Sequence, residues 1–334
     1  MKRVKKQDVE LICRLDRDWD PSIIRVKRLG GQTNKNFVVA HGGKKFFVRL
    51  PWERADIIDR TAEGRNIIAL ARNKKLARIL PRYYAYILKK KNILAPKSRD
   101  VFDVPDGTMV AEFIEGKELT LRIFQQKKYQ KALAKTLHTF HTSGVKFQNR
   151  YDVFHDEIEK YRLDAMKHQF WKLLDKNTIH KLLEIEKEAE RKLPVSKQGI
   201  STHNDCIFQN ILVAKNNRLY LLDFEYAGLN KKGGIFYDLG YVFRDSFFNP
   251  PRMSPETFEQ FLSVADKAYK KKIDRSQIYW AVIAALLVGI WWGITRYFSV
   301  PRKERAYFHT YVHRGVQGVL RLYPEIKKGG QDFS

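Results

Sequence analysis

Short segments with alternating apolar and polar residues occupy the first part of the chain, and longer segments with helical spacing occupy the rest. Three short segments, 22–29, 37–40 and 44–50, are separated by glycine-containing turns, which predicts a three-stranded meander. Residues 6–18 and 57–72 instead have the apolar spacing of helices. Further strands are expected at 80–88, 101–103 and 108–114.

From Lys117 onward the pattern is mainly helical. Helices are expected at 129–142, 236–248, 255–271, 277–298 and 303–323, with two more between 153 and 193. Prolines at 250, 251, 255, 301 and 324 punctuate these segments. A length of 334 residues suits two lobes better than one small core. The sequence therefore predicts an α+β fold, with an N-terminal antiparallel sheet lobe (1–116) and a mainly helical C-terminal lobe (117–334).

One apolar run, residues 279–294, is long enough to raise the question of a membrane span. A spanning helix needs about 20 predominantly apolar residues. This run is shorter and ends at Thr295 and Arg296. A helix buried in the core is favoured.

The chain is strongly basic, with 63 Lys and Arg against 37 Asp and Glu and a formal net charge of +26. The basic residues are spread along the chain in pairs and triplets, without an arginine-rich tail, a zinc-finger pattern or an RNP motif. A diffuse cationic surface that attracts a nucleotide is favoured. No specific nucleic-acid partner is expected, and weak association with an anionic membrane surface is the alternative.

The two cysteines, Cys13 and Cys206, are too few for a disulfide framework and indicate a reducing compartment. The basic first residues are not followed by an apolar signal core. A cytoplasmic location is expected.

The most informative stretch is 201–238, where polar residues flank two short apolar runs. His203-Asn204-Asp205 is followed by Asn210, and the runs 211–214 and 218–222 are separated by a turn rich in asparagine. Asp223-Phe224-Glu225 comes directly after the second run. This pattern predicts a hairpin with carboxylates at both ends.

Phosphoryl transfer from ATP needs these residue types. A carboxylate accepts the proton of the attacking hydroxyl, and we assign this role to Asp205. An amide oxygen and a second carboxylate hold Mg²⁺ against the phosphates, and we assign these roles to Asn210 and Asp223. Glu225 either reaches a second Mg²⁺ or braces Asp223, and the sequence leaves both open.

The order H-x-D-x-x-x-x-N followed by D-F-x is that of protein kinases. With Asp-Phe-Glu-Tyr-Ala-Gly at 223–228, the chain most closely resembles the choline/ethanolamine kinase family within the kinase-like aminoglycoside phosphotransferase superfamily. Only a short segment, without an Ala-Pro-Glu motif, separates Asp223 from Asp238. A peptide-docking segment has no room there. The resemblance therefore implies a two-lobed protein-kinase-like fold, the cofactors ATP and Mg²⁺, and a small acceptor.

The turn after the first strand fits a phosphate-binding loop, because glycine at 30 and 31 lets the backbone approach a phosphate. The resemblance also implies that Arg49 contacts the α- and β-phosphates and that Glu63 is its partner, with an ordinary solvated helix glutamate as the alternative for Glu63. Backbone groups of Glu112, Phe113 and Ile114 would meet adenine. The nucleotide-binding set is Gly30, Gly31, Gln32, Thr33, Asn34, Asn36, Arg49, Glu63, Glu112, Phe113 and Ile114.

A small cationic amino alcohol is the acceptor that the resemblance implies. A quaternary ammonium is held by aromatic faces and a carboxylate. The candidate residues are Tyr226, Asp245, Trp291, Trp292 and Tyr311, with ordinary aromatic core as the alternative. The family often has a tryptophan three positions before Trp292, but Gly289 stands there. Adjacent helical residues point about 100° apart, so Trp292 is favoured over Trp291, and ethanolamine stays as open as choline.

Two further residues are expected to be structural: His203 would orient the catalytic loop, and Asp238 would brace it. His138 and His141 have the spacing of a metal face, but no acidic or cysteine partner accompanies them, so packing is favoured.

The preferred function is an ATP-dependent kinase of choline or ethanolamine. One alternative is a related phosphotransferase that acts on an aminoglycoside, thiamine or a sugar. A third class, a non-catalytic basic binding protein, would show no ATP turnover and would lose its partner steeply with salt.

Overall fold

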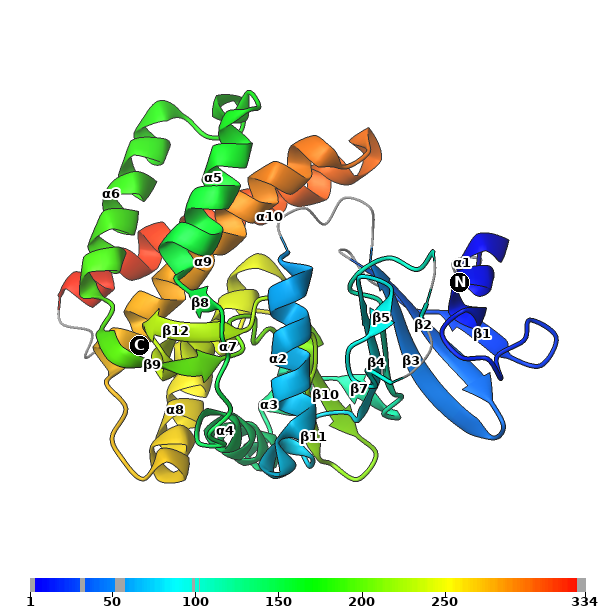
Figure 1. Cartoon of the computed structure of the whole chain (residues 1–334). Coiled ribbons are helices and arrows are strands. Elements are labelled where there is room, and N and C mark those ends of the chain that lie inside the picture. Colours follow the sequence, from blue (N-terminus) through cyan, green and yellow to red (C-terminus); the bar gives the residue numbers. More distant parts are fainter. Residues whose placement is uncertain (1–3, 31–33, 52–57, 98–99, 102, 329–334) are drawn as a thin grey trace. The chain divides into compact units, whose positions relative to one another are not determined.

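The computed structural model describes residues 4–30, 34–51, 58–97, 100–101 and 103–328. The chain forms two compact units. The first comprises Met1–Lys117 with Leu212–Ala227, and the second comprises Glu118–Ile211 with Gly228–Ser334. The hairpin that follows the catalytic loop thus belongs to the first unit. Figure 1 shows the helices and strands of both units.

A six-stranded antiparallel sheet forms the centre of the first unit, in the order β1-β2-β3-β6-β4-β5. Its strands are β1 (Arg25–Arg28), β2 (Asn34–His41), β3 (Lys44–Pro51), β4 (Tyr83–Leu88), β5 (Lys91–Asn92) and β6 (Met109–Glu112). The predicted meander is present, and alternate residues such as Phe37, Val39 and Val48 are fully buried. Strand β6 is the last of these six strands along the chain, but in the sheet it lies between β3 and β4. The residues after Glu112 therefore lie beside the centre of the sheet.

Two helices accompany this sheet, α1 (Lys6–Cys13) and α2 (Arg60–Arg72). Asp59 begins α2 as its cap, because its carboxylate accepts from the backbone N–H groups of Thr61 and Ala62. Gly64 lies where α2 meets β4, and a Cβ atom there would come within 2.7 Å of Leu88 Cδ1 and 2.9 Å of Tyr86 Cε1. The glycine, which costs about 1 kcal/mol of helix propensity relative to alanine, is explained by this close packing.

A small sheet completes the first unit, in the order β11-β10-β7. Its strands are β7 (Gly116–Glu118), β10 (Ile211–Ala214) and β11 (Leu219–Leu221). A Cβ atom on Gly116 would lie 2.4 Å from the Val213 carbonyl oxygen, so only glycine allows the backbone to approach so closely.

The second unit is mainly helical. Its helices are α3 (Leu121–Phe124), α4 (Lys127–His141), α5 (Glu159–Met166), α6 (Lys176–Lys192), α7 (Ile235–Phe248), α8 (Pro255–Tyr269), α9 (Arg275–Ser299) and α10 (Arg302–Lys327), with a π-helical turn at Val153–Ile158 before α5. A three-stranded sheet in the order β8-β12-β9 comprises Arg150–Tyr151, Gly228–Lys232 and Val195–Thr202.

The apolar run 279–294 lies in α9, which forms the centre of the second unit and packs against α5, α6, α7 and α10. By length and composition alone α9 could cross a membrane, but 94% of its most apolar window is buried inside the protein. Ile283, Ala284 and Leu287 have no exposed surface. The arrangement agrees with the predicted buried helix.

Two expectations need correction. Val101 and Asp103, the described residues of the predicted strand 101–103, are not in a strand, and the Val101 N–H donates to the Lys90 carbonyl outside any described ladder. Helix α10 continues through Pro324 to Lys327. The sheet β8-β12-β9 was not predicted, since its pairing is non-local.

Candidate active site

The site in the first unit is built around Arg49, whose side chain on β3 is almost completely buried. Arg49 Nη2 lies 2.6 Å from Glu63 Oε1, and Nη1 lies 3.4 Å from Asp223 Oδ1. Burial lowers the pKa of Arg49, but the charges of Glu63 and Asp223 more than offset this, so its pKa is raised and the guanidinium stays charged. Glu63 is therefore the partner of Arg49 rather than a solvated helix residue.

Glu63 is held from several sides. Tyr86 donates its hydroxyl to Glu63 Oε2 at 2.7 Å, and Arg60 Nη1 donates to the same oxygen at 2.8 Å. Burial raises the pKa of Glu63, but Arg49 and Arg60 outweigh it and lower the pKa overall. Tyr86 and Arg60 were not predicted, because no recognisable sequence motif links either residue to Glu63.

The same network reaches Glu225. Arg60 Nη2 donates to Asn34 Oδ1 at 2.9 Å, and Asn34 Nδ2 donates to Glu225 Oε2 at 3.1 Å. Burial, followed by the charge of Asp223, raises the pKa of Glu225 well above its usual range. Asn34, a residue of the predicted phosphate loop, thus belongs to the same network as both carboxylates of the Asp-Phe-Glu segment. It contacts Glu225 directly, whereas Asp223 joins the network through Arg49.

The rest of the predicted phosphate loop is described only in part. Gly30 has open space around its Cα, and Asn36 lies on β2. Gly31, Gln32 and Thr33 lie outside the described residues.

The predicted adenine-binding segment lines a shallow pocket of about 250 Å³ in the first unit. It is lined by Glu112, Phe113, Ile114, Glu115, Ala214, Lys215, Asn216 and Tyr220. The backbone N–H of Glu112 already donates to the Arg82 carbonyl at 2.7 Å, so it is a ladder group of the sheet. Phe113 and Ile114 come after the end of β6. Glu115 is held at the rim by Lys45 at 2.6 Å and by Lys215.

In the second unit, Asp205 and Asn210 meet directly. Asn210 Nδ2 donates to Asp205 Oδ2 at 2.7 Å and to the Asp205 carbonyl at 3.0 Å. A 3-10 turn, Phe208–Asn210, closes the loop and brings the amide back to the carboxylate. The Asp205 side chain is half-buried, so the loop presents an oriented carboxylate at its surface.

Asp238, at the start of α7, anchors this loop. Its Oδ2 accepts from the His203 backbone N–H at 2.9 Å, and its Oδ1 accepts from the Asn204 N–H at 2.8 Å. His141 Nε2 lies 2.8 Å from Asp238 Oδ2, and its Nδ1 lies 2.6 Å from the Tyr269 hydroxyl. Burial raises the pKa of Asp238, but the bonds from His141 and the loop lower it overall. His141 is thus used in packing and bracing.

Three of the residues predicted to bind the acceptor lie in the second unit near one another. Trp292 and Tyr311 have ring centroids 5.5 Å apart. Asp245 accepts from Gln209 Nε2 at 3.4 Å and from Asn249 Nδ2 at 3.2 Å, which ties it to the catalytic loop. Arg244, which was not predicted, donates from Nη2 to the Tyr311 hydroxyl at 2.8 Å.

Trp291 does not join this group. It is almost completely buried, and its ring packs against Phe170, at a centroid distance of 6.1 Å. The predicted divergence of adjacent helical residues explains the separation from Trp292. Tyr226 is half-buried in the first unit.

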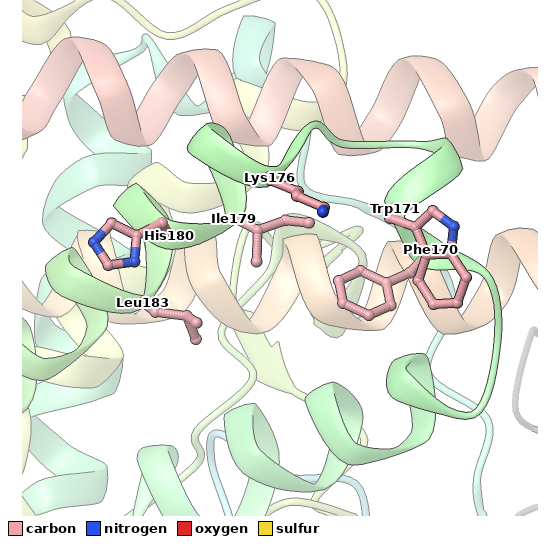
Figure 2. Close-up of a pocket in the computed structure, with 6 residues that line it drawn as sticks. All are labelled: Phe170, Trp171, Lys176, Ile179, His180 and Leu183. Atoms are coloured by element: carbon pink, nitrogen blue, oxygen red, sulfur yellow. The ribbon is translucent and has the colours of Figure 1, made fainter.

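A different hollow, of about 350 Å³, lies on the second unit (Figure 2). It is lined by Phe170, Trp171, Lys176, Ile179, His180 and Leu183. None of the predicted site residues lines it, and it is mostly apolar.

Comparisons with known proteins show the family of the chain. The family model for choline/ethanolamine kinase matches residues 26–255. Protein LicA of Haemophilus influenzae is 24% identical over 205 residues, which cover 60% of this chain and 53% of that protein. The chain thus matches about half the length of this curated relative.

Two solved structures have the same fold over nearly their whole length. Choline kinase LicA from Streptococcus pneumoniae superposes with a TM-score of 0.69 at 22% identity, covering 95% of this chain and 98% of that one. Plasmodium vivax ethanolamine kinase gives a TM-score of 0.69 at 16% identity, covering 96% and 92%. The predicted kinase-like α+β fold, with an antiparallel sheet in the N-terminal part and a helical C-terminal region, is confirmed.

Proposed function

Because the chain belongs to the choline/ethanolamine kinase family, we propose that it transfers the γ-phosphate of ATP to the hydroxyl of a small amino alcohol, choline or ethanolamine. The observation that carries the proposal is the catalytic loop, in which Asn210 donates to Asp205 at 2.7 Å while Asp238 holds the preceding backbone. Phosphoryl transfer depends mainly on positioning and on charge, and this loop is positioned by buried, charge-assisted hydrogen bonds.

Each unit supplies part of the chemistry. In the second unit, Asp205 takes the proton of the acceptor hydroxyl. In the first unit, the Arg49–Glu63 ion pair of 2.6 Å holds a permanent cation for the α- and β-phosphates. The 250 Å³ pocket beside Phe113 and Ile114 would take the adenine.

Each unit carries an oxygen donor that suits Mg²⁺. Asp223 and Asn210 carry the carboxylate and amide oxygens that this hard cation prefers. Glu225 Oε2 accepts a hydrogen bond from Asn34, and burial, followed by the charge of Asp223, raises the pKa of Glu225. This is the electrostatic situation that a nearby divalent cation would relieve. When bound, Mg²⁺ would neutralise the developing phosphate charge.

The test is an acceptor-dependent ATP-turnover assay with choline and ethanolamine on the wild type and on Asp205→Asn and Asp205→Ala. Loss of the base is expected to lower kcat by about 10²- to 10⁴-fold while nucleotide still binds. Asp164→Asn, at a partly exposed carboxylate on α5 paired with Lys167, is the matched control and should keep full turnover.

Retained turnover in Asp205→Ala would remove Asp205 from the mechanism. No turnover with either amino alcohol, together with turnover of thiamine, a sugar or an aminoglycoside, would move the chain to the related phosphotransferases. No ATP turnover with any acceptor would favour the non-catalytic class.

A further inference from the structure

The residues predicted to bind the acceptor in the second unit, Asp245, Trp292 and Tyr311, lie beside a cationic side chain of the protein itself, Arg244. Arg244, on α7, is only 6% exposed. Its Cζ lies 4.5 Å from the Phe248 ring centroid, 5.4 Å from that of Tyr241 and 6.0 Å from that of Tyr311. These distances lie within the range of cation–π interaction. Three aromatic rings thus surround this guanidinium, and one of them, Tyr311, is among the rings that the sequence predicts around a substrate ammonium.

This arrangement is built into the packing. Arg244 Nη2 donates to the Tyr311 hydroxyl at 2.8 Å, and Nε donates to the Ala285 carbonyl at 3.4 Å. The rings of Phe248 and Tyr311 are stacked at 4.2 Å with an interplanar angle of 19°. A side chain that is buried, hydrogen-bonded at two atoms and packed on stacked rings has no low-cost alternative position.

Gly289, which has no side chain, leaves the space that Arg244 and Phe248 occupy. A Cβ atom there would lie 2.5 Å from Arg244 Nη2 and 2.4 Å from Phe248 Cζ. On the next helix, a Cβ atom on Gly315 would lie 2.3 Å from Phe248 Cε1. The guanidinium of Arg244 can therefore lie here only because position 289 is glycine rather than the tryptophan often found in the family. A larger residue at 289 would occupy the space of the guanidinium.

We propose that Arg244 determines acceptor specificity, by occupying aromatic surface that a trimethylammonium group would need, so that the site selects an amino alcohol with a primary ammonium over choline. The proposal rests on the proposed function. A quaternary ammonium has no N–H donor and depends on ring faces, which here already hold a permanent charge of the same sign. A primary ammonium has three N–H donors and can bind a carboxylate directly.

Asp245 is that carboxylate. Its side chain is 14% exposed, and its Oδ1 lies 3.9 Å from Arg244 Nη1. It is held by Gln209, from the catalytic loop, and by Asn249. Arg244 therefore offsets part of the negative charge of Asp245 without forming a close bond to it. A compact ammonium that approaches Asp245 gains a charge-assisted hydrogen bond, whereas a bulky trimethylammonium gains little.

The experiment measures kcat/KM for ethanolamine, N-methylethanolamine, N,N-dimethylethanolamine and choline at saturating ATP. In the wild type, kcat/KM is expected to fall with each methyl group, by about tenfold or more over the series, which corresponds to the loss of one charge-assisted bond. In Arg244→Met, which keeps an unbranched side chain of similar length without charge, the ethanolamine-to-choline ratio is expected to fall by about tenfold or more, because the rings become available.

Arg275→Met is the matched control. Arg275 is also a partly buried arginine of the second unit, paired with Asp266 and Glu259, and its loss should leave the acceptor ratio unchanged even if stability falls. Gly289→Ala is a second variant, since its Cβ would lie 2.5 Å from Arg244 Nη2 and 2.4 Å from Phe248 Cζ and would disturb the contact between the guanidinium and the ring without removing the charge. It should change the ratio in the same direction.

A wild-type enzyme that prefers choline would overturn the proposal, and this measurement does not depend on any variant folding. An unchanged ratio in a folded Arg244→Met would also overturn it. In both cases amino alcohols are still phosphorylated, so the proposed function stands. Absence of turnover with the whole methyl series overturns the proposed function and this inference with it.

Discussion

Glu157 is a buried carboxyl that the proposed reaction does not use. It lies in the π-helical turn Val153–Ile158 and is 3% exposed. Tyr151 donates its hydroxyl to Glu157 Oε1 at 2.7 Å. Burial raises the pKa of Glu157 to about 8, and the charge of Asp205 adds to this, against the lowering effect of the Tyr151 bond. At neutral pH the folded protein therefore holds this side chain mainly as the neutral acid.

The raised pKa makes the free energy of unfolding depend on pH. In the unfolded chain Glu157 loses its proton near its ordinary value of 4.5, but in the folded protein only near 8. Between these values the folded state binds more protons than the unfolded state, so stability falls as pH rises. Each pKa unit corresponds to about 1.4 kcal/mol, which gives a total loss of about 5 kcal/mol from this group.

Glu157→Gln tests this reasoning, because glutamine has nearly the same shape and its amide oxygen can still accept from Tyr151. At pH 5 the variant should match the wild type within about 1 kcal/mol. Above pH 8 it should be more stable by several kcal/mol, up to about 5 kcal/mol.

The assay is urea denaturation between pH 5 and pH 9, followed by tryptophan fluorescence, since Trp171, Trp280, Trp291 and Trp292 lie in the second unit. The quantity compared is the difference in unfolding free energy between variant and wild type at each pH, which cancels the titration of other groups. Glu118→Gln, at an exposed position, should give a flat difference. A flat difference for Glu157→Gln would show that the carboxyl titrates normally and that the burial argument is wrong.

Two further predictions concern the site itself. Glu63→Gln removes the charge that lies 2.6 Å from Arg49. Nucleotide affinity, measured by calorimetry, is expected to fall by about tenfold or more, which corresponds to the loss of one charge-assisted hydrogen bond. The control Glu10→Gln, at an exposed position, should leave the affinity unchanged. Asp238→Asn leaves one acceptor oxygen where two now bind the loop N–H groups. We expect kcat to fall by roughly 10- to 100-fold with the KM for ATP nearly unchanged, and an unchanged kcat would contradict the bracing role.

The sequence predicts the elements that depend on local pattern. The strand at Ile211–Ala214 has the predicted bounds, and α2, α4 and α7 are shorter or longer than predicted by only a few residues. Each of these elements has its own periodic pattern of apolar residues. Strand β12, Gly228–Lys232, has no such period, and it forms because its backbone pairs with residues 195–202 and 150–151. Non-local pairing of polar segments leaves no local signal.

The residues of the candidate site likewise divide into those that the sequence predicts and those that only the structure reveals. Asp205 and Asn210 could be found because fixed offsets along one loop carry them, and Asp238 because the resemblance to the family implies its role. Arg60 and Arg244 could not. Arg60 looks like a first-turn helix residue, yet it contacts both Glu63 and Asn34. Arg244 stands beside an acidic residue, and only the packing shows that its guanidinium lies among three rings.

Two residues of the stretch 201–238 keep a backbone conformation that glycine would adopt at lower cost. Asn204 and Asp223 both have left-handed backbone, with φ of 65° and 60°, a conformation that costs a non-glycine residue of order 1 kcal/mol or more. Glycine would remove the strain at Asn204, but it would also remove the Oδ1 that is bonded by Thr202 at 2.6 Å and Asn230 at 3.2 Å. At Asp223 it would remove the carboxylate 3.4 Å from Arg49. Strain is retained at both positions because the side chain is needed there: Asn204 precedes the proposed base Asp205, and Asp223 is itself a proposed Mg²⁺ ligand.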